Sequence, residues 1–381
     1  MKKEHYFILK SFLVWRLSTF FAAIAVVNYL PVFSENFLAG RISKYITNPL
    51  FWGWANFDGE HYLSIALYGY KNLQQAFFPA YPTLINSVSY FFGTGLEHYL
   101  LSGLIVSNIL FFASLVLFWK IIRLDFSESI AKLSIIALLV FPTSFYFGAV
   151  YTESLFLFSS LLTYYFYRKD KFLLSGLFGI LMTATRIYGV FVLVMIIVEI
   201  LNKKFKLFEF LRQKKYLIFI SFLGLFGYMF YCWKNYGDAL AFYNLQTLVG
   251  EQHQKGIVLL PQVLYRYIKM IFSGAMPILT MQTLILEFLT GILFIIVPIY
   301  GYFKKVKLSY LIYILLGFLV PSVQGSFSSV PRYMVVIFPA FIIIGMFLEH
   351  KPKVVKTMIY VLSAIWMLIN CGLFIRGYWV A

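Results

Sequence analysis

The sequence predicts an all-α polytopic membrane protein, and its composition gives the main reasons. Apolar residues make up 61% of the 381 residues and charged residues only 12%, whereas ordinary soluble domains contain about 25% charged residues. The mean hydropathy is +0.81. The apolar runs are continuous rather than alternating, and within a bilayer only helices or closed barrels satisfy every backbone group. Continuous runs favour helices.

Spanning the hydrocarbon as a helix takes about 20 mostly apolar residues, and on this criterion we expect about 11 transmembrane helices in one multispan domain that covers residues 1–381. Their expected positions are 11–33, 99–119, 133–150, 153–167, 172–187, 189–202, 216–233, 281–303, 308–323, 331–348 and 357–375. A further apolar stretch, 77–93, is short and contains Pro79 and Pro82.

The charge of the connecting segments predicts the orientation of the chain. Six segments together hold 21 basic residues and seven acids, namely 1–10, 120–132, 168–171, 199–215, 304–307 and 349–356. Apart from Arg16, which lies inside the first span, the rest of the chain holds ten basic and eight acidic residues. Basic residues collect in cytoplasmic loops, so these six segments and the N-terminus are expected to be cytoplasmic. The formal charge of +17 then needs no nucleic-acid partner.

This orientation also decides the placement of 77–93. Segments 1–10 and 120–132 are both assigned to the cytoplasm, so an even number of crossings must separate them. The spans 11–33 and 99–119 already supply two crossings. Segment 77–93 is therefore expected to lie on the outer face without crossing.

The two cysteines and the N-terminus have simple interpretations. Cys232 and Cys371 lie in or beside spans and far apart, with no metal or disulfide spacing, so buried thiols are expected. Lys2 and Lys3 before an apolar run are compatible with a signal peptide, but this run is too long for its hydrophobic region.

Two predicted outer segments, 34–98 and 234–280, are longer than a hairpin requires, and long ordered loops are often functional. The first contains FWGWANFDGEHYLSIALYGY and QQAFFPAYPTLI, whose aromatic rings suit juxtamembrane helices at the membrane interface. An aromatic belt alone does not explain why Asp58, Glu60 and His61 lie among these rings.

Helical spacing places Asp58 and His61 on one face and turns Glu60 aside. A carboxylate near a lipid surface has a raised proton affinity and can act as a base. Alternatively, Asp58 caps its helix near Ser64, since Asp is a favoured N-cap residue. The sequence leaves both roles open.

Three more ionisable residues are expected where spans meet the same outer face: Glu153 in AVYTESLF, Arg186 in ATRIYG and Arg332 in SSVPRYMVVIFP. Each has a simpler explanation, since an acid favours a first helical turn and arginine side chains reach for the interface. Ionisable groups are nevertheless costly in membranes. Because arginine binds phosphate bidentately and stays charged, two guanidinium groups beside two acids predict a site for a phosphate-bearing lipid.

Four segments, in order, resemble the GPI mannosyltransferase 2 (PIG-V) family. FDGEHYLSIALYGY followed by AFFPAYPTLI is similar to its first outer loop, and FPTSFYFGAVYTESLF to its Tyr-x-Glu-Ser segment. GLFGILMTATRIYG resembles its glycine-rich segment, and SVPRYMVVIFPAF its late Arg-Tyr motif. Together they span residues 55–345. Phe57 stands where the family usually has tryptophan.

The resemblance implies a GT-C-like glycosyltransferase of prokaryotic type, in the plasma membrane. It would transfer a sugar, most often mannose, from a polyprenyl-phosphate donor to a glycan, glycolipid or protein acceptor on the outer face, with inversion. Asp58 would be the general base, and Glu153 would assist acceptor or metal binding. Arg186 and Arg332 would hold the donor phosphate, and His61 would orient Asp58 or the acceptor. A divalent metal on Asp58, Glu153 and His61 is left open, because the spacing does not establish one.

The competing function is that of a lipid or sugar transporter or flippase. Transporters often show internal repeats and ionisable residues at the membrane midplane. This sequence has no convincing repeat. Its acids cluster at the outer ends of the predicted spans rather than in mid-span, apart from Glu287 near the start of one span. A non-catalytic partner subunit of another glycosyltransferase is a third class that the sequence leaves open.

Overall fold

The computed structural model describes residues 3–33, 38–71, 73–202, 207–245, 258–273 and 277–380, and in these ranges all regular structure is helical. This confirms the all-α class. Five segments are long and apolar enough to cross a membrane: α1 (Lys3–Tyr29), α6 (Leu96–Ile122), the continuous η5–α12 segment (Lys215–Tyr236), α16 (Ile278–Phe303) and α20 (Lys353–Ile375). Shorter apolar helices are α9 (Phe172–Thr183), α10 (Gly189–Asn202), α17 (Leu308–Ser322) and α19 (Phe338–Glu349). The chain is a multi-pass membrane protein.

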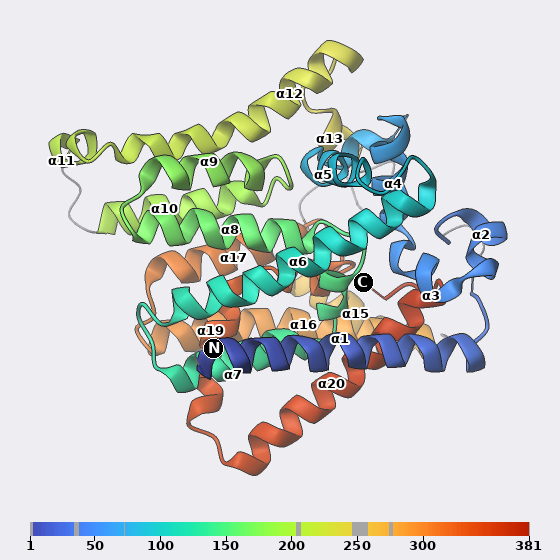
Figure 1. Cartoon of the computed structure of the whole chain (residues 1–381). Coiled ribbons are helices and arrows are strands. Elements are labelled where there is room, and N and C mark those ends of the chain that lie inside the picture. Colours follow the sequence, from blue (N-terminus) through green and yellow to red (C-terminus); the bar gives the residue numbers. More distant parts are fainter. Residues whose placement is uncertain are drawn as a thin grey trace.

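The long helices run side by side, and a group of short helices gathers at one end of the bundle (Figure 1). In the bundle, α8 (Glu153–Arg168) packs against α6 and α9, α7 (Glu128–Leu139) against α19, and α10 against α17. The short helices are α2 (Arg41–Thr47), α3 (Pro49–Trp52), α4 (Asp58–Tyr68) and α5 (Ala80–Ser89). We call this the loop end. With 10 residues, α5 is too short to span the hydrocarbon by itself, and the expectation that 77–93 does not cross stays a prediction.

The basic segments meet at the opposite end. Arg168 binds both oxygens of Asp125, at 2.7 and 2.9 Å, and Lys307 Nζ lies 2.9 Å from Asp125 Oδ2. Burial alone would raise the pKa of Asp125, but the hydrogen bonds from Arg168 and Lys307 outweigh it and hold that pKa below its usual value. Arg168 Nε also lies 3.6 Å from Glu199 Oε1. These contacts join four of the six segments that the charge pattern assigned to one side.

Two predicted spans are broken in the structure. Within 133–150, α7 ends at Leu139 and the 3-10 helix η4 (Ser144–Gly148) follows; within 331–348, α18 (Val330–Met334) is separate from α19. Pro142 accounts for the first break, because proline lacks an N–H and disfavours helical backbone in the preceding residue. The two breaks meet, since Thr143 Oγ1 donates a 2.8 Å hydrogen bond to the carbonyl oxygen of Pro331.

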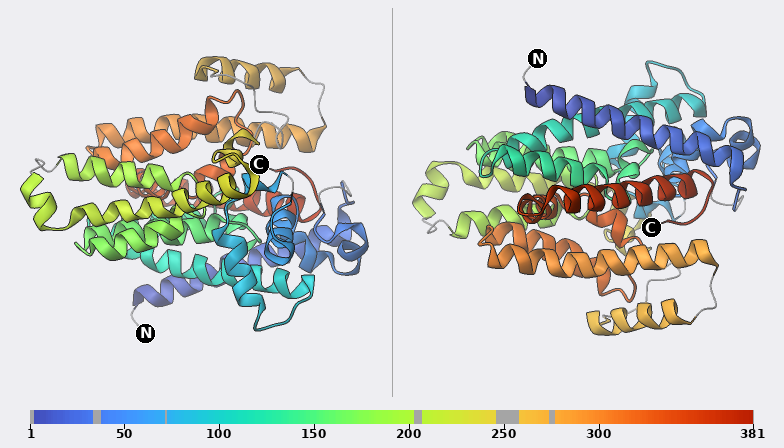
Figure 2. Two further views of the ribbon diagram at one scale, coloured as in Figure 1. Left: turned by 90° about the horizontal axis from the view of Figure 1, so that it is seen from above. Right: turned by 90° about the horizontal axis from the view of Figure 1, so that it is seen from below.

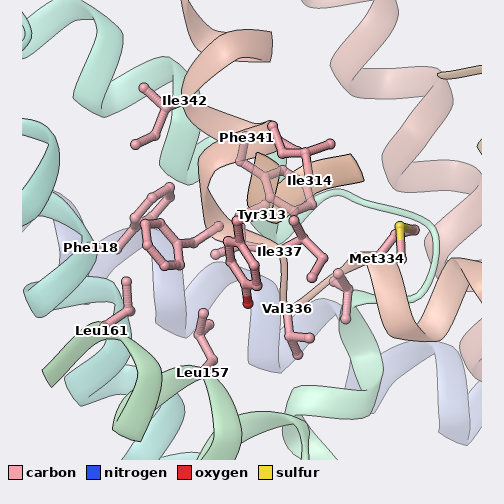
Figure 3. Close-up of a cluster of buried hydrophobic side chains, with 14 of the residues drawn as sticks. Phe118, Leu157, Leu161, Tyr313, Ile314, Met334, Val336, Ile337, Phe341 and Ile342 are labelled. Carbon is pink, nitrogen blue, oxygen red and sulfur yellow. The ribbon is translucent and has the colours of Figure 1, made fainter. Parts of the chain in front are cut away.

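The link between α18 and α19 is held in the centre of the core. Figure 3 shows Met334, Val336 and Ile337 among side chains from the surrounding helices, and all three are buried. The neighbours drawn there are Phe118 of α6, Leu157 and Leu161 of α8, Tyr313 and Ile314 of α17, and Phe341 and Ile342 of α19. This packing fixes the position of α18, which carries Arg332. Cys232 and Cys371 are buried free thiols, as expected.

Glycines allow α9 and α12 (Phe222–Tyr236) to approach closely, as small residues do in membrane helices. A Cβ atom on Gly224 would collide with the carbonyl oxygen of Ile180 and lie 2.5 Å from Thr183 Oγ1. Gly227, on the same helix, has no heavy atom within 4 Å of such a Cβ position.

We therefore expect Gly224→Ala to lower the thermal unfolding temperature of the purified protein, because overpacking a core costs about 1–3 kcal/mol. Gly227→Ala is the matched control, and it should leave the unfolding temperature unchanged or raise it, since alanine has the higher helix propensity. Equal unfolding temperatures for the two variants would contradict the close packing of α9 and α12.

Candidate active site

Asp58 is the first residue of α4, and the strained backbone of Phe57 sets the start of this helix. Phe57 has φ 57° and ψ −122°, a conformation that side-chain-bearing residues rarely adopt and that surrounding structure must enforce. Its ring contacts Phe374 and Trp379, with centroids 5.9 and 5.6 Å away. Phe57, not Asp58, is the N-cap residue, so Asp58 does not have the capping role that the sequence left open.

Asn56 fixes the loop that leads to Asp58. It is fully buried, and its Oδ1 atom accepts a hydrogen bond from the backbone N–H of Ala39 at 3.1 Å. Its Nδ2 atom donates to the carbonyl oxygens of Phe374 and Ile375, both at 3.0 Å. Its own carbonyl oxygen accepts a 2.8 Å hydrogen bond from the Tyr151 hydroxyl. Through its side chain and its backbone carbonyl, Asn56 thus joins the first loop to the end of α20 and to the segment before α8.

Arg332 lies opposite Asp58. Its Nη1 atom is 2.6 Å from Asp58 Oδ2, a charge-assisted hydrogen bond of the strong kind. The Arg332 side chain is 7% exposed, whereas that of Asp58 is 28% exposed. Asp58 therefore remains reachable from outside, although its partner is buried.

Glu153 lies between two arginines. It begins α8 and is fully buried. Its Oε1 atom is 3.0 Å from Arg186 Nη2 and 3.9 Å from Arg332 Nε. Asp58, Glu153, Arg186 and Arg332 come from four separate segments of the chain, and the structure brings them into one network of alternating charge.

Two atoms of this network lack a hydrogen-bond partner among the described residues: Glu153 Oε2 and Arg332 Nε, both buried. Buried polar atoms in proteins are normally hydrogen-bonded. Glu153 Oε2 and Arg332 Nε therefore keep unused hydrogen-bonding capacity within the network.

Tyrosine rings surround the guanidinium groups. The rings of Tyr146, Tyr151 and Tyr333 have their centroids 5.7, 5.6 and 5.3 Å from the central guanidinium carbon of Arg332. Arg186 lies 5.5 Å from the Tyr333 ring. Such contacts stabilise a desolvated cation without neutralising it, so both arginines keep their charge for an anion.

A cavity of about 530 Å³ opens onto Asp58, Arg186 and Arg332. Tyr62 also lines it, and burial, together with the nearby Asp58 carboxylate, raises the pKa of the Tyr62 hydroxyl and keeps it protonated. The apolar walls include Phe77, Phe78, Tyr188, Phe191, Phe242 of α13 (Ala241–Asn244), Pro321 and Trp379. The cavity is thus lined both by charged groups and by apolar side chains from several helices.

The structure does not bring His61 into this network, although helical spacing placed it on the same face as Asp58. His61 is exposed, stacks on the ring of Phe77 with centroids 4.8 Å apart, and lies 3.5 Å from Gln74. Asp58, Glu153 and His61 therefore do not converge on one metal position. No group of three or more His, Cys, Asp or Glu residues that could hold a metal occurs in the described ranges.

Comparison with known proteins defines the fold. No family model and no curated protein matches the chain. Two solved structures of the Archaeoglobus fulgidus oligosaccharyltransferase match it. The apo form has a TM-score of 0.52 at 12% identity and covers 100% of this chain. The form tethered to an acceptor peptide with the NVT sequon has a TM-score of 0.51 at 13% identity and covers 99%. This chain spans only 57% and 56% of those chains. The chain thus shares the GT-C fold of that oligosaccharyltransferase.

Several residues of the site were missed from the sequence. Tyr333 follows Arg332 directly and Tyr151 precedes Glu153 by two positions, so their place in the same motifs was a usable signal. Asn56 and Trp379 gave no local signal, because their roles depend on contacts between segments far apart in the chain.

Proposed function

We propose that this protein is a membrane glycosyltransferase that moves a sugar from a polyprenyl-phosphate donor to an acceptor hydroxyl. The observation that carries the proposal is the 2.6 Å contact between Asp58 and Arg332 on the surface of the cavity. It places a carboxylate that can accept a proton beside a guanidinium that can bind phosphate. The GT-C fold, shared with an oligosaccharyltransferase, is further support.

In this proposal the donor phosphate binds Arg332 and Arg186 and replaces Asp58 as the partner of Arg332. Asp58 then accepts the proton of the acceptor hydroxyl as the hydroxyl oxygen attacks the anomeric carbon. The bond from that carbon to the phosphate oxygen breaks, the polyprenyl phosphate leaves with the electron pair, and the anomeric configuration inverts. Because phosphate is a good leaving group, no second carboxylic acid is required, unlike in a glycosidase.

Glu153 is assigned a positioning role rather than contact with the acceptor. It is fully buried and holds Arg186 at 3.0 Å, so it would keep both guanidinium groups in place while the phosphate is exchanged. His61, which stacks on Phe77, would support the cavity wall and would not accept the proton of the acceptor hydroxyl.

The finer assignments rest on the resemblance to the PIG-V family. They are mannose as the sugar, a glycan, glycolipid or protein as the acceptor, and an active site on the outer face with a cytoplasmic N-terminus. The loop end would then face away from the cytoplasm.

The test is an assay of the purified protein with radiolabelled polyprenyl-phosphate mannose and a panel of glycan, glycolipid and peptide acceptors. We expect labelled product with at least one acceptor. The same protein in vesicles is assayed in parallel for movement of a fluorescent analogue of the donor lipid between the two leaflets. Lipid movement without any sugar transfer would refute the glycosyltransferase function and favour the transporter function.

A further inference from the structure

A buried tyrosine–glutamate pair lies next to the active-site network and takes no part in the proposed chemistry. Glu287 of α16 is 3% exposed and Tyr267 of α15 (Leu260–Phe272) is 2% exposed. The Tyr267 hydroxyl donates a 2.5 Å hydrogen bond to Glu287 Oε2. In Figure 2, α15 lies beside α16 at the edge of the bundle in both views, so this bond fastens a peripheral helix to a long one.

The same pair holds the segment that leads to Arg332. The backbone N–H of Phe327 donates to the Tyr267 hydroxyl oxygen at 3.0 Å, so this hydroxyl joins the Glu287 carboxylate to the segment. The ring of Phe327 covers Gly291 of α16 so closely that a Cβ atom there would lie 2.8 Å from it. The backbone before α18 is therefore fixed at Phe327 by a hydroxyl that a buried carboxylate holds in place.

The fixed segment ends in the strained residue that starts α18. Ser329 has φ 62°, a left-handed conformation that surrounding contacts must enforce in a residue with a side chain. Its carbonyl oxygen accepts a 3.0 Å hydrogen bond from the backbone N–H of Tyr333, and Arg332 follows within the same turn. Both Ser329 and Arg332 line the cavity. A shift of Ser329 would consequently move the Arg332 guanidinium away from Asp58.

We propose that Tyr267 and Glu287 are positioning residues that hold the Arg332 guanidinium at the place where the donor phosphate binds. Neither residue lines the cavity, so they act through the 327–332 backbone. In this way α15, which belongs to the second loop, is coupled to the phosphate site. The effect on the donor rests on the proposed function, whereas the effect on the backbone does not.

The test compares Tyr267→Phe with Tyr164→Phe. Tyr164 is a matched control because its hydroxyl also donates to a buried glutamate, Glu199 Oε2, at 2.9 Å, but at the opposite end of the bundle. Two quantities are measured: the dissociation constant for polyprenyl-phosphate mannose, and hydrogen exchange of the backbone amide of Phe327.

For Tyr267→Phe we expect faster exchange at the Phe327 amide and about tenfold weaker donor binding, as the loss of one hydrogen bond to a charged group implies. The KM for the acceptor should not change. Tyr164→Phe should lower thermal stability and leave donor binding and the Phe327 amide as in the parent. Equal changes in the two variants, or no change in Tyr267→Phe, would overturn the positioning role.

A second pair of variants keeps the proposal testable if Tyr267→Phe does not fold. Glu287→Gln retains a side-chain oxygen that can accept the hydrogen bond from Tyr267, whereas Glu287→Leu does not. We expect Glu287→Gln to keep slow exchange at the Phe327 amide and Glu287→Leu to lose it, and the reverse order would refute the proposal. If the parent protein binds no donor, the proposed function fails, but the exchange measurement still decides the positioning role.

Discussion

Asp58→Asn should lower kcat for sugar transfer by about 10²–10⁴-fold, the range expected when a general base is removed. Asparagine has nearly the same shape and keeps an oxygen that can accept the hydrogen bond from Arg332, at 2.6 Å in the parent protein. The cavity and the donor site should therefore be preserved, while the group that accepts the proton is lost. The dissociation constant for the donor should stay close to that of the parent.

Glu60→Gln is the matched control, because Glu60 lies two residues further along α4. Like Asp58, Glu60 is partly buried; burial raises its pKa, and the nearby Arg41 opposes this. Glu60 is not part of the cavity lining, and Glu60→Gln should transfer sugar like the parent. If Asp58→Asn transfers sugar as fast as the parent under single-turnover conditions, Asp58 is not the base.

Arg332→Ala should weaken donor binding by about 10–100-fold, since a hydrogen bond to a charged group is worth about 1.5–3 kcal/mol. The fold should survive this change. Asp58 would lose its partner, but its side chain is 28% exposed and can be hydrated. Glu153, which is fully buried, would still be paired with Arg186 at 3.0 Å. The measurement is the dissociation constant for polyprenyl-phosphate mannose, together with the KM for the acceptor.

Arg332→Lys separates charge from geometry at this position. Lysine keeps the positive charge but lacks the planar fork that binds phosphate bidentately and that contacts the surrounding tyrosine rings. Donor binding by Arg332→Lys should lie between that of the parent and that of Arg332→Ala. A loss confined to acceptor binding in both variants would contradict the assignment of Arg332 to the donor phosphate.

The sequence was sufficient for the fold class, because composition and continuous apolar runs require helices in a membrane. It was less informative about where helices break. Residues 133–150 and 331–348 are apolar enough to suggest continuous spans, yet each contains a break, and the breaks carry the segments that contact each other through Thr143 and Pro331. Hydropathy averages over such short interruptions, so it does not detect them.

The candidate site was predictable in part for a specific reason. Asp58, Glu153, Arg186 and Arg332 are ionisable residues at or near the ends of separate helices, and an ionisable residue in an apolar context is conspicuous. His61 was equally conspicuous but lies against Phe77 outside the network. Helical spacing predicts which face of a helix a residue occupies, but it does not predict the direction of a side chain in the first turn.

The remaining contacts had no local sequence signal. Asn56 joins segments more than 300 positions apart, and Tyr267 meets Glu287 and Phe327 only after α15 has packed on α16. Polar and aromatic residues of these types occur throughout a chain with 29 tyrosines. Which of them support the site is decided by tertiary packing.

The central claim is that the lipid-linked donor places its phosphate on Arg332 and Arg186 and its anomeric carbon in front of Asp58. The most direct measurement is an experimental structure of the protein with a bound non-transferable polyprenyl-phosphate sugar. We expect phosphate oxygens within hydrogen-bond distance of both guanidinium groups and the Asp58 carboxylate released from Arg332. A phosphate bound outside this cavity, with the Asp58–Arg332 contact intact, would contradict the claim.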